Sequence, residues 1–175
     1  MIISEKIKQK MDKMREHFPT TQALLIPLLQ EIQFEQGYLS ASALLESASF
    51  LQLPLSKVKE VVSFYTMFQT EPIGKVHLQL CTNISCWLNG SEHLLECLEK
   101  KLKIQCGETT LDGKYTLSEV ECLASCGTAP VLQVNEDYHE GLDEKKLMDL
   151  LEKIEGQIKN NDSFVGRTYR KELEL

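Results

Sequence analysis

The sequence lacks several features that would assign a protein to a class directly. It has no run of about 18 or more apolar residues, so we expect no membrane-spanning helix and no direct membrane insertion. Neither a Gly-x-Gly-x-x-Gly motif nor a P-loop occurs, which argues against a nucleotide-binding site on this chain. Basic residues are few, since 19 Lys and Arg stand against 26 Asp and Glu for a net charge of −7. That balance argues against a general affinity for nucleic acid or anionic membranes.

The N-terminal stretch also lacks the apolar segment and the cleavage site of a secretory signal peptide. Its acidic residues Glu5, Asp12 and Glu16 argue against an organellar transit peptide, because such peptides are poor in acidic residues. We therefore expect a cytoplasmic protein. Six cysteines in a chain of that kind favour metal or redox chemistry over a disulfide framework, because the cytoplasm keeps thiols reduced.

Four of the six cysteines form two closely spaced pairs. Cys81 and Cys86 are separated by four residues, and Cys122 and Cys126 by three. Each pair follows a short strand-like run, so both pairs could lie in loops at one end of a sheet. Each pair can clamp one metal ion, and two irons that share bridging sulfides make a 2Fe–2S cluster, which four thiolates suit. The pattern therefore predicts a cluster, with short loops whose N–H groups can point at the sulfurs.

Other metal and redox sites also use closely spaced cysteines. Structural zinc takes pairs of similar spacing, so spacing alone leaves zinc open. A thioredoxin-type active site needs Cys-x-x-Cys, which is absent. A Rieske centre needs two histidines in place of one pair, and none of the four histidines lies in either loop. Plant-type ferredoxins carry a third cysteine three residues after the first pair, where this chain has Asn89.

Residues 1–72 have the pattern of a small helical bundle. Apolar residues recur at helical spacing in four short segments, each with a start or stop signal. The expected features are a first helix from Ser4 to Phe18, a second from Thr20 or Thr21 to Gln36 that is kinked at Pro27, a third capped by Ser40 and a fourth capped by Ser56.

Residues 73–156 have a mixed pattern, so the chain as a whole is expected to be α+β. The order β-α-β-β-β-α predicts a four-stranded sheet covered by two helices. Asp112-Gly113 predicts a turn between two strand-like runs, Glu108–Leu111 and Tyr115–Glu121. Ser91 or Asn89 opens the first helix, and Asp143 caps the last. Leu142 is expected to contact Leu147 as a hydrophobic staple. Residues 157–175 have the composition of a polar C-terminal tail.

With these motifs in view, the chain resembles a known family over roughly residues 5–156. The matching stretches are the two cysteine pairs with their flanks, Gly107–Thr110, Asp112-Gly113, Ala129-Pro130, Ser63–Phe68 and Gly37–Ser40. They are similar to the thioredoxin-like 2Fe–2S ferredoxin family, which in bacteria includes the E subunit of NADH:quinone oxidoreductase, respiratory complex I.

The resemblance implies a thioredoxin-like domain in which Cys81, Cys86, Cys122 and Cys126 bind one 2Fe–2S cluster. It also implies a one-electron carrier in the peripheral arm of complex I, on the cytoplasmic side of the inner membrane. FMN and NADH are then expected on a flavin- and NAD-binding partner subunit, and this chain alone should not oxidise NADH. The alternatives are the equivalent subunit of an NAD-linked hydrogenase or formate dehydrogenase, and a zinc-binding structural interaction module.

The chain departs from the family at one point, and three other residues need an interpretation. The family usually has Gly-Ala where this chain has Ala124-Ser125. The Ser125 hydroxyl could donate to a cluster sulfur, and we expect a modestly altered cluster potential. Cys97 is interpreted as a packed thiol and Cys106 as a structural or free one. Trp87, next to Cys86, could shield the cluster or contact a partner.

Overall fold

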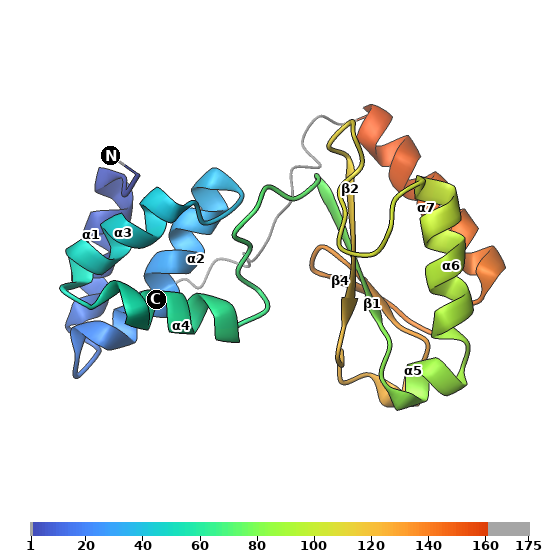
Figure 1. The fold of residues 1–175 in the computed structure, drawn as a ribbon, viewed down its shortest axis with the longest axis horizontal. Helices are drawn as coiled ribbons and strands as arrows, with labels where there is room; N and C mark the ends of the chain where they lie inside the picture. Colours follow the sequence, from blue (N-terminus) through green and yellow to red (C-terminus); the bar gives the residue numbers. More distant parts are fainter. Residues whose placement is uncertain (1, 161–175) are drawn as a thin grey trace. The chain divides into compact units, whose positions relative to one another are not determined.

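The structure is a computed structural model that describes residues 2–160, which form two compact units (Figure 1). The first unit extends to Pro72 and the second begins at Ile73. Each unit has a hydrophobic core of its own, so each is described by itself. Within residues 2–160, no helix is both long and apolar enough to cross a bilayer.

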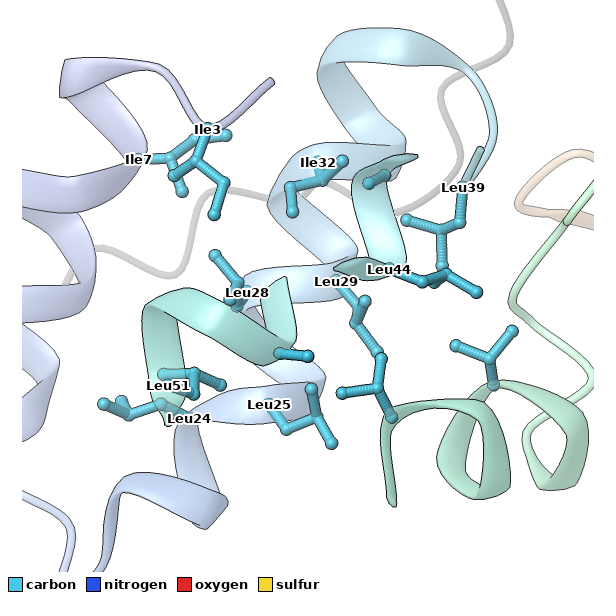
Figure 2. Packing of buried hydrophobic residues seen from close by; sticks show 14 of the residues in the cluster. Ile3, Ile7, Leu24, Leu25, Leu28, Leu29, Ile32, Leu39, Leu44 and Leu51 are labelled. Carbon is cyan, nitrogen blue, oxygen red and sulfur yellow. The ribbon is translucent and has the colours of Figure 1, made fainter. Parts of the chain in front are cut away.

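The first unit consists of helices, as the sequence predicts. The helices are α1 (Glu5–Arg15), α2 (Leu25–Gln36), α3 (Ala41–Leu51) and α4 (Leu55–Phe64), and a 3-10 turn, η1 (Thr21–Leu24), precedes α2. Figure 2 shows leucine and isoleucine side chains of α1, α2 and α3 meeting in the centre of the bundle. Fully buried members of this core include Ile7, Met11, Leu25, Leu28, Leu29, Ile32 and Leu51.

Two of the predicted helix caps in this unit are confirmed and one is wrong. Ser4 Oγ accepts from the N–H of Ile7 at 3.3 Å, and Ser40 Oγ accepts from that of Ala43 at 3.2 Å. Helix α4 begins one residue before Ser56, with Pro54 in the capping position. Proline suits the start of a helix because its φ is already fixed near the helical value and its missing N–H would have no partner there.

The kink expected at Pro27 rested on a wrong helix boundary. The sequence predicts one helix from Thr20 or Thr21, in which Pro27 would remove a backbone hydrogen bond. The α-helix instead begins at Leu25, which places Pro27 in its first turn. Backbone N–H groups in a first turn have no partner within the helix, so the proline removes nothing.

The second unit is a four-stranded mixed sheet with helices packed against it. The strands are β1 (Val76–Cys81), β2 (Tyr115–Val120), β3 (Leu132–Val134) and β4 (Asp137–His139), in the order β2-β1-β3-β4. β1 is parallel to β2 and antiparallel to β3, which is antiparallel to β4. Helices α6 (Ser91–Leu102) and α7 (Glu144–Asn160) lie side by side against the sheet (Figure 1). This is the predicted order of strands and main helices.

Local signals in the second unit are mostly confirmed. The N–H of Lys146 donates to Asp143 Oδ1 at 2.8 Å, so Asp143 caps α7 as predicted. The turn at Asp112-Gly113 is present, but the stretch before it forms only an isolated bridge and no strand. Helix α7 continues to Asn160, into the expected polar tail, and the rest of that tail, residues 161–175, lies outside the described residues.

Candidate metal centre

Both cysteine pairs begin at the same edge of the sheet, as the sequence predicts. Cys81 is the last residue of β1, and its neighbour in the register is Val120, the last residue of β2. The two strands are parallel, so their carboxyl ends meet at one edge. Cys122 follows Val120 by two residues, so the second cysteine segment (residues 122–126) starts beside the first (residues 81–86). The parallel register is what brings two segments about 40 residues apart together.

The first cysteine segment contains a short helix that was not predicted. Asn83 Oδ1 accepts from the N–H of Ile84 at 2.8 Å and starts α5 (Ile84–Leu88), which carries Cys86. The expected loop between Cys81 and Cys86 is therefore wrong in its second half. A helix places Cys86 more rigidly than a loop does, because its backbone is held by hydrogen bonds such as that from Trp87 N–H to the carbonyl of Asn83.

The second cysteine segment is irregular and is shaped by its backbone. Ala124 has a left-handed φ of 58°, and its N–H donates to Cys122 Sγ at 3.2 Å. A single 3-10 turn, η2 (Cys126–Thr128), then begins at the second cysteine. The left-handed residue reverses the chain between the two cysteines and aims a backbone donor at the first of them.

Cys81 lies where donors from both segments meet. Burial raises the pKa of its thiol, but backbone N–H bonds from Asn83 and Leu123 and hydrogen bonds with the thiols of Cys86 and Cys122 together hold that pKa below its usual value. The structure therefore stabilises a thiolate at this position. The contacts also show that cysteines of both pairs approach one another.

Cys86 has the opposite tendency. Burial and the neighbouring Cys81 thiol raise the pKa of Cys86, against a backbone N–H bond from Val131 that lowers it. Without a metal, the pair accommodates one negative charge more easily than two, as expected for acids in contact. Bound cations would remove that limit, because thiolates coordinate metals and the metal charge offsets theirs.

The donor set fits a cluster of two irons. Four thiols come from two segments, and backbone N–H groups point at three of the sulfurs, those of Cys81, Cys86 and Cys122. Such donors stabilise an anionic cluster. One tetrahedral zinc would instead hold all four sulfurs about 3.8 Å from one another.

The two pairs differ in their exposure to solvent. Cys81 and Cys86 are 3% and 2% exposed, and they pack with Leu123 and Val131 in a small apolar cluster. Cys122 and Cys126 are exposed. One side of the site is thus enclosed by protein, and the other is open to solvent.

The structure corrects the role expected of Ser125. Its hydroxyl donates to the carboxylate of Glu140 and is hydrogen-bonded to Thr128 Oγ1 at 2.8 Å, so it does not donate to a sulfur. The bonds from Ser125 and then Thr128 lower the pKa of Glu140. Ser125 therefore fastens the second cysteine segment to the loop after β4.

The remaining cysteines and the tryptophan lie outside this donor set. Cys97 is 9% exposed, which confirms the predicted packed thiol, and Cys106 is partly buried. Burial raises the pKa of Cys106, whose thiol is hydrogen-bonded to Glu119. Trp87 is 54% exposed despite following buried Cys86. Of its two expected roles, this exposure favours contact with a partner.

Comparison with known proteins agrees with the geometry. Residues 11–155 match the sequence model of the thioredoxin-like [2Fe-2S] ferredoxin family. The E subunit of NADH-quinone oxidoreductase from Rickettsia prowazekii is 46% identical over 137 residues, 78% of this chain and 77% of that protein. A second relative, the NADH-quinone oxidoreductase E subunit 2 of Rhizobium meliloti, is 47% identical over 146 residues, 83% of this chain and 87% of that one.

Among solved structures, an NAD+-reducing [NiFe]-hydrogenase in the air-oxidized state has a TM-score of 0.67 at 27% identity. The match covers 77% of this chain but only 23% of the hydrogenase chain, so this chain corresponds to about a quarter of that protein. The family match spans both units described above and includes all four cysteines of the site. The chain therefore belongs to the thioredoxin-like [2Fe-2S] ferredoxin family and binds one 2Fe–2S cluster.

Proposed function

We propose that this chain is the 2Fe–2S electron-carrier subunit of the NADH-oxidising arm of a bacterial respiratory NADH:quinone oxidoreductase. The observation that carries the proposal is the meeting of two cysteine pairs at the carboxyl ends of β1 and β2, with backbone donors aimed at their sulfurs. Relatives that cover most of this chain at 46% and 47% identity are named as the E subunit of that complex.

In this proposal, Cys81, Cys86, Cys122 and Cys126 are the four ligands. A bound 2Fe–2S cluster supplies one-electron transfer. The residues of the chain supply the rest: apolar side chains keep water from the inner pair, and backbone N–H groups offset the charge of the thiolates. In this proposal, the two-electron chemistry of NADH belongs to another subunit.

The partner is a subunit that binds flavin and NAD, in the peripheral arm on the cytoplasmic side of the membrane. The chain has no nucleotide-binding motif of its own. Helix α5 presents Ile84, Trp87 and Leu88 to solvent at 69%, 54% and 71% exposure, immediately around Cys86. Exposed apolar side chains in one turn of helix favour a protein interface, and this one would bring the partner close to the cluster.

A second candidate is the equivalent subunit of an NAD-reducing hydrogenase. The structural similarity to part of such an enzyme favours it. The respiratory assignment is stronger because its relatives are more similar and match over most of their own length. Purification of the native complex would separate the two: quinone reduction by NADH supports the first assignment, and NAD reduction by hydrogen the second.

The ligand assignment is tested by spectroscopy on the full chain purified without oxygen. We expect a red-brown protein with two irons and two sulfides per chain and a rhombic EPR signal after reduction. Replacing any one of the four ligand cysteines by Ser should weaken or remove that signal. Cys106→Ser is the matched control and should keep it. A colourless protein that holds one zinc on four sulfurs would instead identify a structural zinc module.

A further inference from the structure

Three potential metal ligands meet between the first two turns of helix α6 and the first residue of helix α7. His93 and Cys97 are four residues apart on α6 and so share one face of it. Glu144, the first residue of α7, lies 51 positions after His93 in the sequence. His93 Nε2 lies 3.1 Å from Glu144 Oε2 and 3.7 Å from Cys97 Sγ. All three donor atoms lie within 4.8 Å of one another, the one such group among the described residues.

The arrangement is not a nucleophile–base–acid relay. A relay of that kind uses both ring nitrogens of the histidine, one for the nucleophile and the other for the carboxylate. Here the thiol and the carboxylate both approach Nε2 of His93. Three donor atoms of these types within 4.8 Å of one another are instead suited to binding a metal ion.

Two of the three distances between donor atoms are close to those of one face of a tetrahedron. Zinc binds imidazole nitrogen and carboxylate oxygen at about 2.0–2.2 Å and thiolate sulfur at about 2.3 Å. At tetrahedral angles, these bond lengths place neighbouring donor atoms about 3.3–3.6 Å apart. The observed separations of 3.1 Å and 3.7 Å need only small side-chain shifts to meet those values.

The surroundings leave a route for the ion and decide its type. The His93 and Glu144 side chains are each 61% exposed, whereas Cys97 at 9% lies beneath them. The ion can therefore enter from solvent, and water can occupy a fourth position. A thiolate and an imidazole select a borderline cation such as Zn²⁺ over Mg²⁺ or Ca²⁺, which prefer oxygen ligands alone.

We propose that His93, Cys97 and Glu144 form a second metal site, separate from the cysteine pairs, that binds one Zn²⁺ ion with a water as fourth ligand. Binding forms a Zn–S bond and releases the Cys97 proton to solvent, with no change in oxidation state. Burial and then the Glu144 carboxylate raise the pKa of Cys97, so this proton has to be displaced by the metal. The bound ion would fasten the first turn of α7 to α6.

The test is zinc titration of the full chain with its iron–sulfur cluster in place, with a chromophoric chelator as competitor. Wild type should take up one Zn²⁺ per chain while the visible spectrum of the cluster stays constant. His93→Gln, Glu144→Gln and Cys97→Ser should each weaken this uptake by about tenfold or more. Glu96→Gln is the matched control, an exposed carboxylate on the same helix, and should bind as wild type does.

X-ray absorption at the zinc edge identifies the ligands independently of affinity. The expected spectrum has one sulfur at about 2.3 Å and nitrogen or oxygen atoms at about 2.0–2.2 Å. Four sulfurs would mean that zinc had entered the cysteine pairs instead. That result would overturn the proposal. So would the absence of zinc uptake by wild type, and so would equal zinc uptake by wild type, His93→Gln and Glu144→Gln. None of these outcomes depends on whether the chain serves NADH oxidation.

Discussion

The backbone N–H of Ala124 donates to the sulfur of Cys122 from a left-handed conformation, with φ at 58° and an N···S distance of 3.2 Å. Glycine would adopt such a φ without strain. Alanine adopts it at a cost of roughly 1–2 kcal/mol, because its Cβ approaches a backbone carbonyl oxygen. The contact to Cys122 is thus held by a residue that is poorly suited to making it.

Ala124→Gly should therefore stabilise the second cysteine segment. We expect a higher thermal midpoint and slower cluster loss on heating, by the equivalent of about 1 kcal/mol. Calorimetry and loss of visible absorbance measure the two effects. Ala129→Gly is the control, because Ala129 has an ordinary φ of −62° and glycine there should bring no gain. An unchanged or lower midpoint in Ala124→Gly would show that the left-handed position is not strained in the loaded protein.

Ser125→Ala should leave the reduction potential close to that of wild type. The Ser125 hydroxyl is bonded to Glu140 and Thr128 and so offers no donor to a cluster sulfur. Loss of these bonds should instead loosen the segment and speed the release of iron to a chelator. A redox titration and a chelation time course measure the two effects. A clear fall in potential would show that the hydroxyl turns to a sulfur when the cluster is bound.

The pH dependence of stability should depend on His77. Burial lowers the pKa of His77 from 6.5 to about 4, and its Nε2 is hydrogen-bonded to Ser118 Oγ at 2.9 Å. The His77 imidazole is therefore protonated below about pH 6.5 in the unfolded chain but only below about pH 4 in the folded protein. The contribution of His77 to the free energy of unfolding is therefore fully present above the unfolded pKa and is lost on acidification. The loss reaches about 3 kcal/mol at pH 4.

Denaturant unfolding across this pH range measures the effect. His77→Gln keeps a polar group near Ser118 but cannot be protonated, so its loss of stability below about pH 6.5 should be smaller than in wild type. His17→Gln, at an exposed histidine of the other unit, should keep the full dependence. Identical curves for wild type and His77→Gln would assign the acid sensitivity to other groups.

The sequence was most informative where a pattern is local or periodic. Ser4, Ser40 and Asp143 cap helices as predicted, because a capping bond joins residues only three apart. Helix α5 was missed because a helix of five residues shows no periodicity, and Asn83 was its only start signal. The partners of Ser125 were also missed, since Glu140 is 15 residues away and nothing local marks it.

The same reasoning explains why Cys97 was interpreted only as a packed thiol. Its burial follows from the apolar stripe of α6, which is visible in the sequence. Its neighbour Glu144 is brought close by the packing of α6 against α7, and 51 positions separate that carboxylate from His93. Contacts of that range depend on the whole layer of the fold, so the three side chains become a group only in three dimensions.

The exposed face of α5 should determine binding to the proposed flavin- and NAD-binding partner. Trp87 and Leu88 are more than half exposed and directly follow Cys86 on its helix. Replacing both by Ser should weaken co-purification with that partner by at least about tenfold, since buried aromatic anchors dominate interface energies. The cluster spectrum should persist, because neither side chain is a ligand or part of the apolar cluster around the inner cysteines.

The matched control is Leu111→Ser, which removes a fully exposed leucine from the turn before β2. It should bind the partner as wild type does, because it changes surface hydrophobicity away from α5. Pull-down of the tagged partner, with iron content measured in the same fractions, separates lost docking from a lost cluster. Normal binding by the Trp87 and Leu88 double variant would show that the interface lies on another face and that α5 does not take part in it.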